Sequence, residues 1–483
     1  MLLCAALLTG AATTKAQVRY LDEVFTNVQV DTSVTYAQNY EFFTGFAQLL
    51  PLKMDVYRPV GDTATNRPVI LLSHNGSFLP ENLTTSLLGL CFGGKRDSSM
   101  VELCTRFAKR GYVAVSFDYR LGWSATSPTQ EVRTATIIRA VYRAMQDAKA
   151  LVRYFKNDFS SNGNSYGIDT SRFVIGGSNS GAYVALAASA LNDTAEINAV
   201  KFTGTNGAFI KQDTIGDFDG FGGVQNHNNY PGYSSKFQCV LALGGAVGDT
   251  SWIQAGETPV IAFHGVNETG TPFNTGIVTT TTGQPVIEVS GAGDFMPQVI
   301  AKGNNASLSP NNFQDGPPNW DGAAQTTTLE GLYPFYGQGF EPWNWYNATC
   351  YSGSSSMQGL NPGASNAKAN TYIDTIMGYS APRLYKLLID PSYTGTGVGI
   401  NEVAKGLTRV YPNPAKGELN IMVMNQPVSS VRMYDIAGRL SKEVSNINSF
   451  STQVNINGMN SGLYLVTVTL ADGAVATHRV VIE

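Results

Sequence analysis

The sequence predicts an α/β protein: a mostly parallel sheet with helices on both faces, followed by a small all-β sandwich at the C-terminus. Three observations support this. Apolar runs of strand length alternate with helical patterns over residues 53–265. A strand, a turn of small residues and an apolar helix follow one another at residues 173–186. After a Gly- and Thr-rich stretch at residues 392–399, short alternating strands are separated by Gly, Asn and Pro.

Individual elements follow from periodicity. The elements predicted in the first domain are strands at 53–59 and 67–74, a helix and then a strand over 101–120, a helix over 134–158, the strand and helix of 173–186, and strands at 238–247 and 258–265. Strands that alternate with crossover helices indicate a mostly parallel sheet.

Composition limits the partners. The 483 residues are 43% hydrophobic and 14% charged, which allows one large domain and one small domain. The net charge of −4 is spread without blocks, so neither nucleic acid nor an anionic membrane is expected as a partner. No cofactor is expected.

The N-terminus predicts export. Residues 1–16 form a short apolar run that ends in small residues, as in a signal peptide, so the mature chain would begin at Gln17. The run lacks the usual positive start, which points to an initiator Met further upstream. It is too short to span a bilayer, and Cys4 lies too near the start for a lipid anchor.

Four cysteines remain in the mature chain, an even number for an oxidising compartment. We expect Cys91 to pair with Cys104 across a short loop, which leaves Cys239 with Cys350. The alternative is buried free thiols. Zinc is not expected, because no CxxC or HxxxH spacing occurs.

Six segments resemble an extracellular carboxylesterase of the α/β-hydrolase superfamily. In chain order they are RPVILLSHNGSF, FAKRGYVAVSFDYRLG, QDAKALVRYFKND, YGIDTSRFVIGGSNSGA, TPVIAFHG and YGQGFEPW. The resemblance covers about residues 30–390, with a closing helix at 371–389. It implies an α/β-hydrolase domain over residues 17–390, followed by a linker at 391–404.

The tail resembles another family. VYPNPAKGELNIMV, VRMYDIAGR and NGMNSGLYLVTV are similar to the C-terminal sorting domain of the type IX secretion system of Bacteroidetes, here residues 405–483. That resemblance implies the type IX machinery as a partner and a location at the surface or outside of a Gram-negative cell. The alternative, a carbohydrate-binding sandwich, lacks an exposed aromatic row.

Ester hydrolysis needs a hydroxyl nucleophile, a histidine, a carboxylate and N–H donors for the oxyanion. In a G-x-S-x-G elbow, small residues flank the nucleophile at two positions on either side. Gly177 and Gly181 bracket Asn179 in this way, and an amide is a poor nucleophile. If the turn is shifted by one residue, Ser178 becomes the nucleophile and Ser180 replaces the second glycine.

The base also departs from the family. In the family the histidine lies in G-x-G-H-x-P-W, whereas GQGFEPW has Phe340 at that position. The chain has four histidines, His74, His227, His264 and His478. Only His478 follows both the nucleophile and the acid, and it lies in the sorting domain.

The remaining positions are altered too. Glu268 stands where the family has the acid. Because it has no catalytic histidine to orient, we expect Glu268 to be a loop carboxylate that is bonded to backbone amides, near a packed His264. The family's H-G-G-G-F loop becomes His74, Asn75, Gly76, Ser77 and Phe78. Gly76 still offers a donor, but a complete oxyanion hole is not expected.

Two functions therefore remain. The first is an exported pseudohydrolase that serves binding or assembly, with a surface partner or a second copy. The second is an active carboxylesterase whose displaced triad uses Ser178, His227 and an acid such as Glu268. The loop that holds His227 also carries Asp213, Asp217 and Asp219, whose spacing lacks an ordered calcium pattern and predicts solvated side chains.

Overall fold

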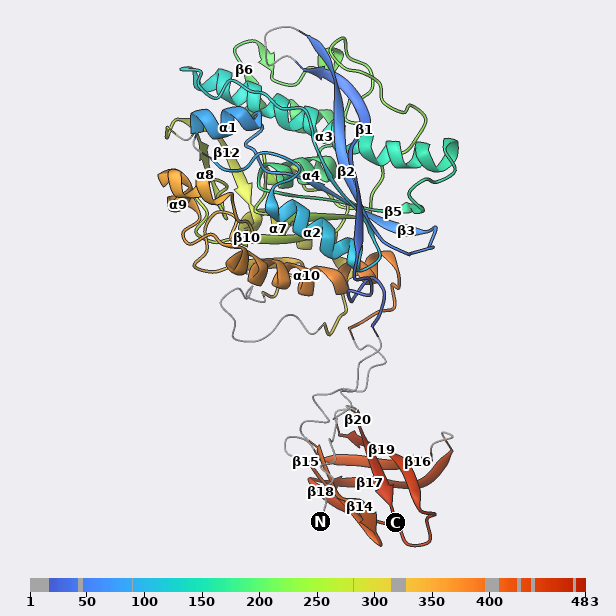
Figure 1. The fold of residues 1–483 in the computed structure, drawn as a ribbon. Coiled ribbons are helices and arrows are strands. Elements are labelled where there is room, and N and C mark those ends of the chain that lie inside the picture. The colour runs from blue at the N-terminus through green and yellow to red at the C-terminus, as the bar shows by residue number, and fades with distance from the viewer. Residues whose placement is uncertain are drawn as a thin grey trace, which may run out of the picture. The chain divides into compact units, whose positions relative to one another are not determined.

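The computed structural model describes residues 17–41, 47–88, 90–280, 282–313, 327–395, 408–423, 427–435, 439–471 and 475–483. The chain divides into a larger unit, residues 16–395, and a smaller unit that contains residues 396–483 (Figure 1). The predicted signal peptide at 1–16 and most of the predicted linker at 391–404 lie outside the described residues.

An eight-stranded sheet forms the centre of the larger unit, in the order β1-β2-β4-β3-β5-β8-β10-β13. From β4 to β13 all neighbours are parallel, whereas β1 and β2 join antiparallel at one edge. The strands are β1 (Val28–Glu41), β2 (Gln48–Pro59), β3 (Arg67–Ser73), β4 (Val113–Phe117), β5 (Ile168–Ser178), β8 (Cys239–Leu243), β10 (Val260–Gly265) and β13 (Leu332–Phe335).

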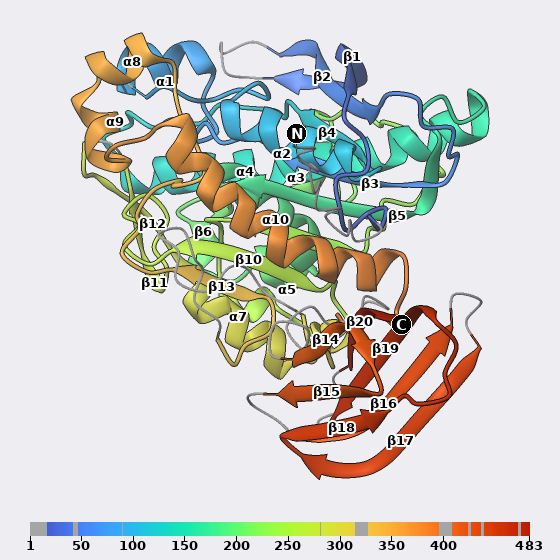
Figure 2. The same ribbon diagram turned by 60° about the horizontal axis from the view of Figure 1, so that its bottom comes forward.

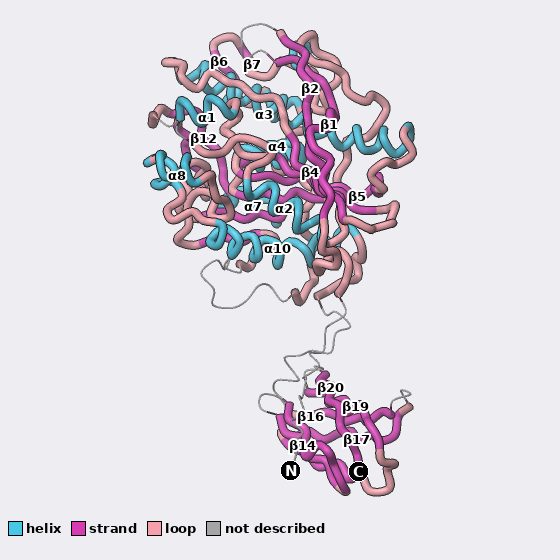
Figure 3. The backbone as a smooth tube through the Cα atoms, viewed as in Figure 1, coloured by secondary structure: helices cyan, strands magenta, loops and turns pink. Residues whose placement is uncertain are grey.

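Helices cover both faces of this sheet (Figures 2 and 3). On β3, Ile70 and Leu72 join the core with α2 (Ser98–Lys109) and α10 (Asn366–Leu388). Their neighbours Val69 and Leu71 join the opposite core, which is covered by α3 (Gln130–Ser161), α4 (Ser180–Ala190) and α7 (Ala292–Ala301). Successive side chains of a strand point to opposite faces, so this continuous apolar strand is buried on both sides. The predicted fold class is confirmed.

The predicted elements are present, and two further strands, β1 and β13, join them in the central sheet. The helix expected over 134–158 extends over Gln130–Ser161, and the closing helix covers Asn366–Leu388. Strand β1 was not predicted, because an edge strand that is largely exposed carries little apolar pattern. Shorter elements complete the unit: α1 (Glu81–Leu88), α5 (Thr194–Ile197), α6 (Gln212–Ile215), α8 (Ala348–Gly353), α9 (Ser355–Leu360), β6 (Thr203–Gly204), β7 (Gly207–Ala208), β9 (Ala246–Val247), β11 (Thr275–Thr279) and β12 (Pro285–Gly291).

The smaller unit is all β, as predicted. Its strands are β14 (Thr408–Lys416), β15 (Glu418–Val423), β16 (Val428–Asp435), β17 (Leu440–Ser449), β18 (Ser451–Asn455), β19 (Gly462–Leu470) and β20 (Val475–Ile482). The predicted segment 410–423 forms β14 and β15, which are joined at Gly417 with a φ of +77°. Alternate residues such as Leu419, Ile421, Val466 and Val468 form its core.

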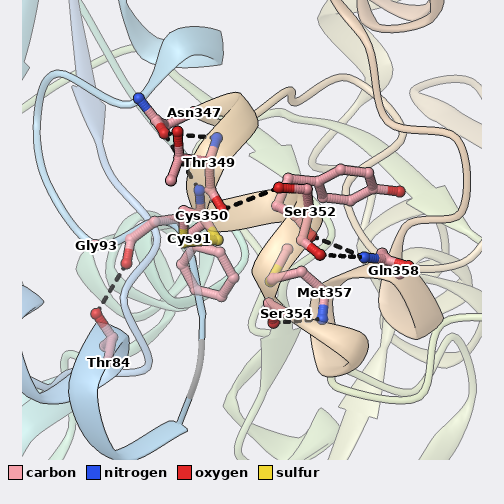
Figure 4. Close-up of a disulfide and its surroundings, with 12 residues drawn as sticks. Thr84, Cys91, Gly93, Asn347, Thr349, Cys350, Ser352, Ser354, Met357 and Gln358 are labelled. Carbon is pink, nitrogen blue, oxygen red and sulfur yellow. Dashed lines mark hydrogen bonds between the residues drawn. A yellow bond between two sulfur atoms is a disulfide. The ribbon is translucent and has the colours of Figure 1, made fainter.

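The predicted disulfide pairing is wrong. Cys91 is bonded to Cys350, with their Cα atoms 5.9 Å apart (Figure 4). Cys104 and Cys239 are buried free thiols. The short loop misled the prediction because α2 begins between Cys91 and Cys104 and directs Cys104 into the core on the sheet, while Cys239 lies on the central strand β8. Burial raises the pKa of both thiols, so they are poor nucleophiles.

Two further properties concern the described residues as a set. Among them, no helix combines the length and the hydropathy that crossing a bilayer requires. The same residues contain no cluster of three His, Cys, Asp or Glu side chains arranged to hold a metal ion. Asp217 instead accepts bonds from the backbone of Asp219 and Phe221, and Asp219 accepts one from Ser235.

Candidate functional site: the turn between β5 and α4

Asn179 lies at the vertex of the turn between β5 and α4, with φ of 43° and ψ of −107°. Glycines make this turn possible. A Cβ at Gly177 would lie 2.4 Å from the carbonyl carbon of Gly181, and one at Gly181 would lie 2.0 Å from the Ser73 oxygen. The structure therefore places the flanking glycines around Asn179 and not around Ser178.

The Asn179 side chain is held by two acceptors. Its nitrogen, assigned from the surrounding hydrogen bonds, donates to the Gly244 oxygen at 2.9 Å and to Glu268 Oε1 at 2.8 Å. Its backbone N–H donates to the Leu243 oxygen at 2.7 Å. A carboxamide with these bonds is fixed, and it carries no proton that a base removes near neutral pH.

Ser178 has different neighbours. Its hydroxyl donates to Glu341 Oε1 at 2.5 Å and accepts from Trp343 Nε1 at 2.9 Å. The residue is 1% exposed, and Ser178 is not among the described residues that line the adjacent cavity. The Ser178 hydroxyl is therefore bonded to a buried carboxyl group and an indole, and no histidine among the described residues bonds to it.

Phe340 occupies the position at which the resembling family has its catalytic histidine. Its ring packs on Phe92, with ring centroids 5.3 Å apart, and it lines the cavity beside Asn179. Leu90 and Met357 complete this apolar cluster. The phenyl ring can take part in packing, but it cannot accept or return a proton.

Glu341, the next residue, was missed by the sequence analysis. Its carboxylate accepts from Ser178 and from Asn344 Nδ2 at 3.2 Å, and the Asn361 side chain donates to its backbone oxygen at 2.8 Å. Its backbone has a φ of +41° and the residue is fully buried. The signal was a lone glutamate between Phe340 and Pro342-Trp343, since an unpaired charge inside an apolar segment is uncommon.

Glu268 and His264 lie close together below the turn. His264 Nε2 is 3.8 Å from Glu268 Oε2 and 3.0 Å from the Thr271 oxygen. Burial lowers the pKa of His264 to about 4, so the ring is neutral at physiological pH. Burial raises the pKa of Glu268 well above its ordinary value, and the negative charge of Glu341 raises it further. Glu268 accepts from the Asn179 side chain, not from a histidine that could act as base.

In the loop after β3, the Asn75 side chain bonds to neighbouring groups of the protein. Asn75 Oδ1 accepts from the Gly76 N–H at 2.7 Å, lies 3.1 Å from Ser180 Oγ and is 3.4 Å from the Ser180 N–H nitrogen. His74 stacks on Tyr119 with ring centroids 4.7 Å apart. Burial lowers the pKa of His74. The backbone oxygen of Ser77 accepts from Trp123 Nε1 at 2.8 Å.

His227 lies elsewhere. It is exposed, and its backbone N–H donates to Asn39 Oδ1 of β1 at 3.0 Å. His478 belongs to β20 of the smaller unit, where it lies opposite Val466. The structure therefore does not assemble His227 with Ser178 and Glu268.

A cavity of about 350 Å³ opens beside Asn179. Its walls come mainly from α3, β12, the start of α4 and the segment around Phe92. Representative aliphatic and aromatic lining residues are Phe78, Phe92, Ile138, Val141, Val289 and Phe340. Pockets that bind small molecules are typically apolar in this way, with a few placed polar groups.

Comparison with protein families gives two matches. The model of a secretion-system C-terminal sorting domain matches residues 409–483. A family model named BD-FAE matches residues 54–275. None of the curated proteins compared with the chain matches it.

Solved structures similar to the chain include an esterase of Thermogutta terrifontis. Esterase 2 phosphorylated by paraoxon is 16% identical, with a TM-score of 0.41, over 75% of this chain and 95% of that chain. The butyrate-bound form is 15% identical, with a TM-score of 0.40, over 72% of this chain and 92% of that chain.

Proposed function

This chain is an esterase-like α/β-hydrolase that ends in a type IX sorting domain, and we propose that it is a catalytically inactive member that binds a ligand in the cavity beside Asn179. The sorting domain directs the chain through the type IX system to the cell surface or the extracellular space. The proposal therefore describes an exported binding protein built on a hydrolase scaffold.

The position of Asn179 is the observation that carries the proposal. Acyl transfer needs a hydroxyl or thiol at the vertex of the turn, and a base that removes its proton. The Asn179 amide offers neither. Its nitrogen donates to the Gly244 oxygen and to Glu268. The second bond occupies the carboxyl group that would orient a catalytic histidine.

The histidines support the same conclusion. His264 is buried against Thr271, and His74 is stacked on Tyr119. His227 is exposed beside β1. A displaced triad would need Ser178 to leave Glu341 and Trp343, and His227 to leave its loop, so the geometry favours binding over hydrolysis.

Ester hydrolysis by the purified chain tests the proposal. With p-nitrophenyl butyrate we expect no turnover above the buffer rate, and we expect no labelling by a serine-reactive phosphonate. Ser178→Ala is the matched variant, and it should leave that background unchanged. Turnover or labelling in the unmodified chain that Ser178→Ala or His227→Ala abolishes would overturn the proposal.

A further inference from the structure

The donors that would bind a substrate oxygen are already occupied by the protein. In this fold the oxyanion hole is formed by the N–H of the residue after the nucleophile and by an N–H of the loop after the third strand. Here these are the N–H groups of Ser180 and Gly76. Both face Asn75 Oδ1, at 3.4 Å and 2.7 Å, and Ser180 Oγ lies 3.1 Å from the same oxygen.

The Asn75 oxygen is thus an internal carbonyl at the place where an acyl oxygen would lie. The Asn75 side chain is 3% exposed and lines the cavity, so a ligand meets this filled position when it reaches the floor. A second carbonyl or carboxylate oxygen there would face the Asn75 oxygen and would find the N–H groups of Gly76 and Ser180 already occupied, which is unfavourable.

The floor of the cavity also offers an anion no positive group. Glu268 accepts from the Asn179 amide directly below the cavity, and Glu341 lies behind Ser178. Both are buried carboxyl groups. An anionic head group placed on Asn179 would find no cation among the described residues that line the cavity.

The polar groups at the other end of the cavity are hydroxyls. Ser77, Thr279 and Thr280 line both this cavity and the broader groove outside it, so they mark its mouth. Between floor and mouth the walls are mostly aliphatic and aromatic, and the lining also includes Tyr183, Thr269 and Thr271. This arrangement suits a hydrocarbon chain whose single polar group is neutral and remains at the mouth.

We propose that the cavity binds uncharged, largely hydrocarbon molecules such as medium-chain alcohols, and that the Asn75 side chain is the group that rejects carboxylates and esters at the floor. This inference rests on the proposed binding function and names the ligand class of that site. It assigns Asn75 a role in specificity.

Isothermal titration with octanol and octanoate tests this inference on the full chain. The unmodified protein should bind octanol about tenfold more tightly than octanoate, because the two backbone donors at the floor are occupied by the Asn75 oxygen. Asn75→Ala should strengthen octanoate binding about tenfold and leave octanol binding within about twofold. Asn75→Gly, which has the glycine of the family, is a second variant with the same expected effect. Asn226→Ala is the control, since this buried asparagine bonds Asn39 and lies outside the cavity lining.

Each outcome has a distinct meaning. Octanoate can also bind in reverse, with its carboxylate near Arg139 and Arg143 of the outer groove, and such binding would not respond to Asn75. Equal affinities for both ligands that Asn75→Ala and Asn75→Gly leave unchanged would therefore overturn the inference, as would no binding of octanol. Hydrolysis of p-nitrophenyl octanoate would instead overturn the proposed function.

Discussion

The turn at Asn179 has the backbone of a nucleophile elbow, with a carboxamide at its vertex. Its φ of 43° and ψ of −107° lie in a sparsely populated region, which costs about 1–3 kcal/mol for a residue with a Cβ. The close approach of Gly177 to Gly181 enforces this geometry. The bonds from Asn179 to Gly244 and Glu268 offset part of the strain. Because this backbone geometry is present, restoring the side chains is a direct test of the proposed inactivity.

Repair of the site should require more than one change. Asn179→Ser alone should leave esterase activity near background, because an unassisted serine lacks a base, and Phe340→His alone lacks a nucleophile. The double variant should raise the rate about a hundredfold or more, which is the lower range that a positioned base contributes. Adding Asn75→Gly should raise it again by freeing the N–H groups of Gly76 and Ser180. Initial rates with p-nitrophenyl butyrate measure each step.

The gain should be strongly non-additive, since members of a triad act as a unit. If Asn179→Ser alone restored high activity, a base would already be present and the assignment of Phe340 would be wrong. Ser178→Ala in the double variant is the control, because Ser178 is bonded away from the cavity and its loss should not remove the gain.

Glu268 should make stability depend on pH. Burial and the charge of Glu341 raise its pKa in the folded protein above the ordinary 4.5, so folding favours the protonated form. Its contribution is fully present below the ordinary pKa and is lost as the pH rises through the raised value. Glu268→Gln should therefore gain stability relative to the unmodified chain as the pH increases, and differ little in acid.

Thermal unfolding between acid and neutral pH measures this effect. The matched control is Glu288→Gln, because Glu288 is exposed on β12. A Tm difference between Glu268→Gln and the unmodified chain that stays constant with pH, or that shrinks as the pH rises, would contradict the prediction.

At the scale of elements, the disulfide connects a segment that lines the cavity to helix α8. Cys91 lies between Leu90 and Phe92, and Cys350 belongs to α8, which precedes the helix that carries Met357 (Figure 4). Leu90, Phe92, Met357 and Phe340 pack together. The bond therefore closes a long loop of chain and holds this wall of the cavity in place.

Loss of this bond should destabilise the larger unit. We expect Cys350→Ser to lower the free energy of unfolding by about 2–4 kcal/mol, the usual effect of removing such a cross-link. Denaturant unfolding of the oxidised chain and of the variant measures it. Mass mapping without reduction should find Cys91 joined to Cys350, with Cys104 and Cys239 alkylated only after unfolding. A peptide that joins Cys239 to Cys350 would refute the structural pairing.

Local patterns predicted the elements better than the contacts between them. Helical spacing over 134–158 and the apolar run of β3 were sufficient, because burial on one or two faces leaves a periodic record in the sequence. Gly177 and Gly181 lie two residues before and after Asn179, and this local spacing predicted that Asn179 lies at the nucleophile position of the turn. The bonds of Glu341 to Ser178 span 163 residues, and no local pattern records such a contact.

Because local patterns do not record such contacts, the disulfide pairing and the bonds of Asn75 were also not predicted. Cysteine spacing carries no information on which thiols face the core, so the pairing of Cys91 was not predictable. The sequence showed that Asn75 replaces a glycine, which suggested a weakened oxyanion hole with a remaining donor at Gly76. That this donor is bonded to the Asn75 side chain depends on a rotamer, which only the folded loop determines.

At the scale of the whole molecule, the division into two units separates the unit with the proposed binding cavity from the sorting domain. The larger unit keeps its own two cores on either side of the sheet, and the smaller unit has a core of its own. Each should therefore fold without the other. The ring of Tyr393 packs on Phe313 and Tyr385, and the Thr394 oxygen accepts from the Asn312 N–H at 2.6 Å. A truncation that preserves folding should therefore end at Gly395 and not earlier.

A chain that ends at Gly395 should fold, retain ligand binding and fail to leave the cell. In a host with the type IX system we expect it to accumulate in the periplasm, because the matched sorting domain at residues 409–483 is missing. Fractionation followed by octanol titration of the recovered protein measures location and folding separately. The full chain in the same host is the control for delivery to the surface. Surface delivery of the truncated chain would contradict the role of the tail, whereas a truncated chain that is degraded or unfolded would contradict the independence of the larger unit.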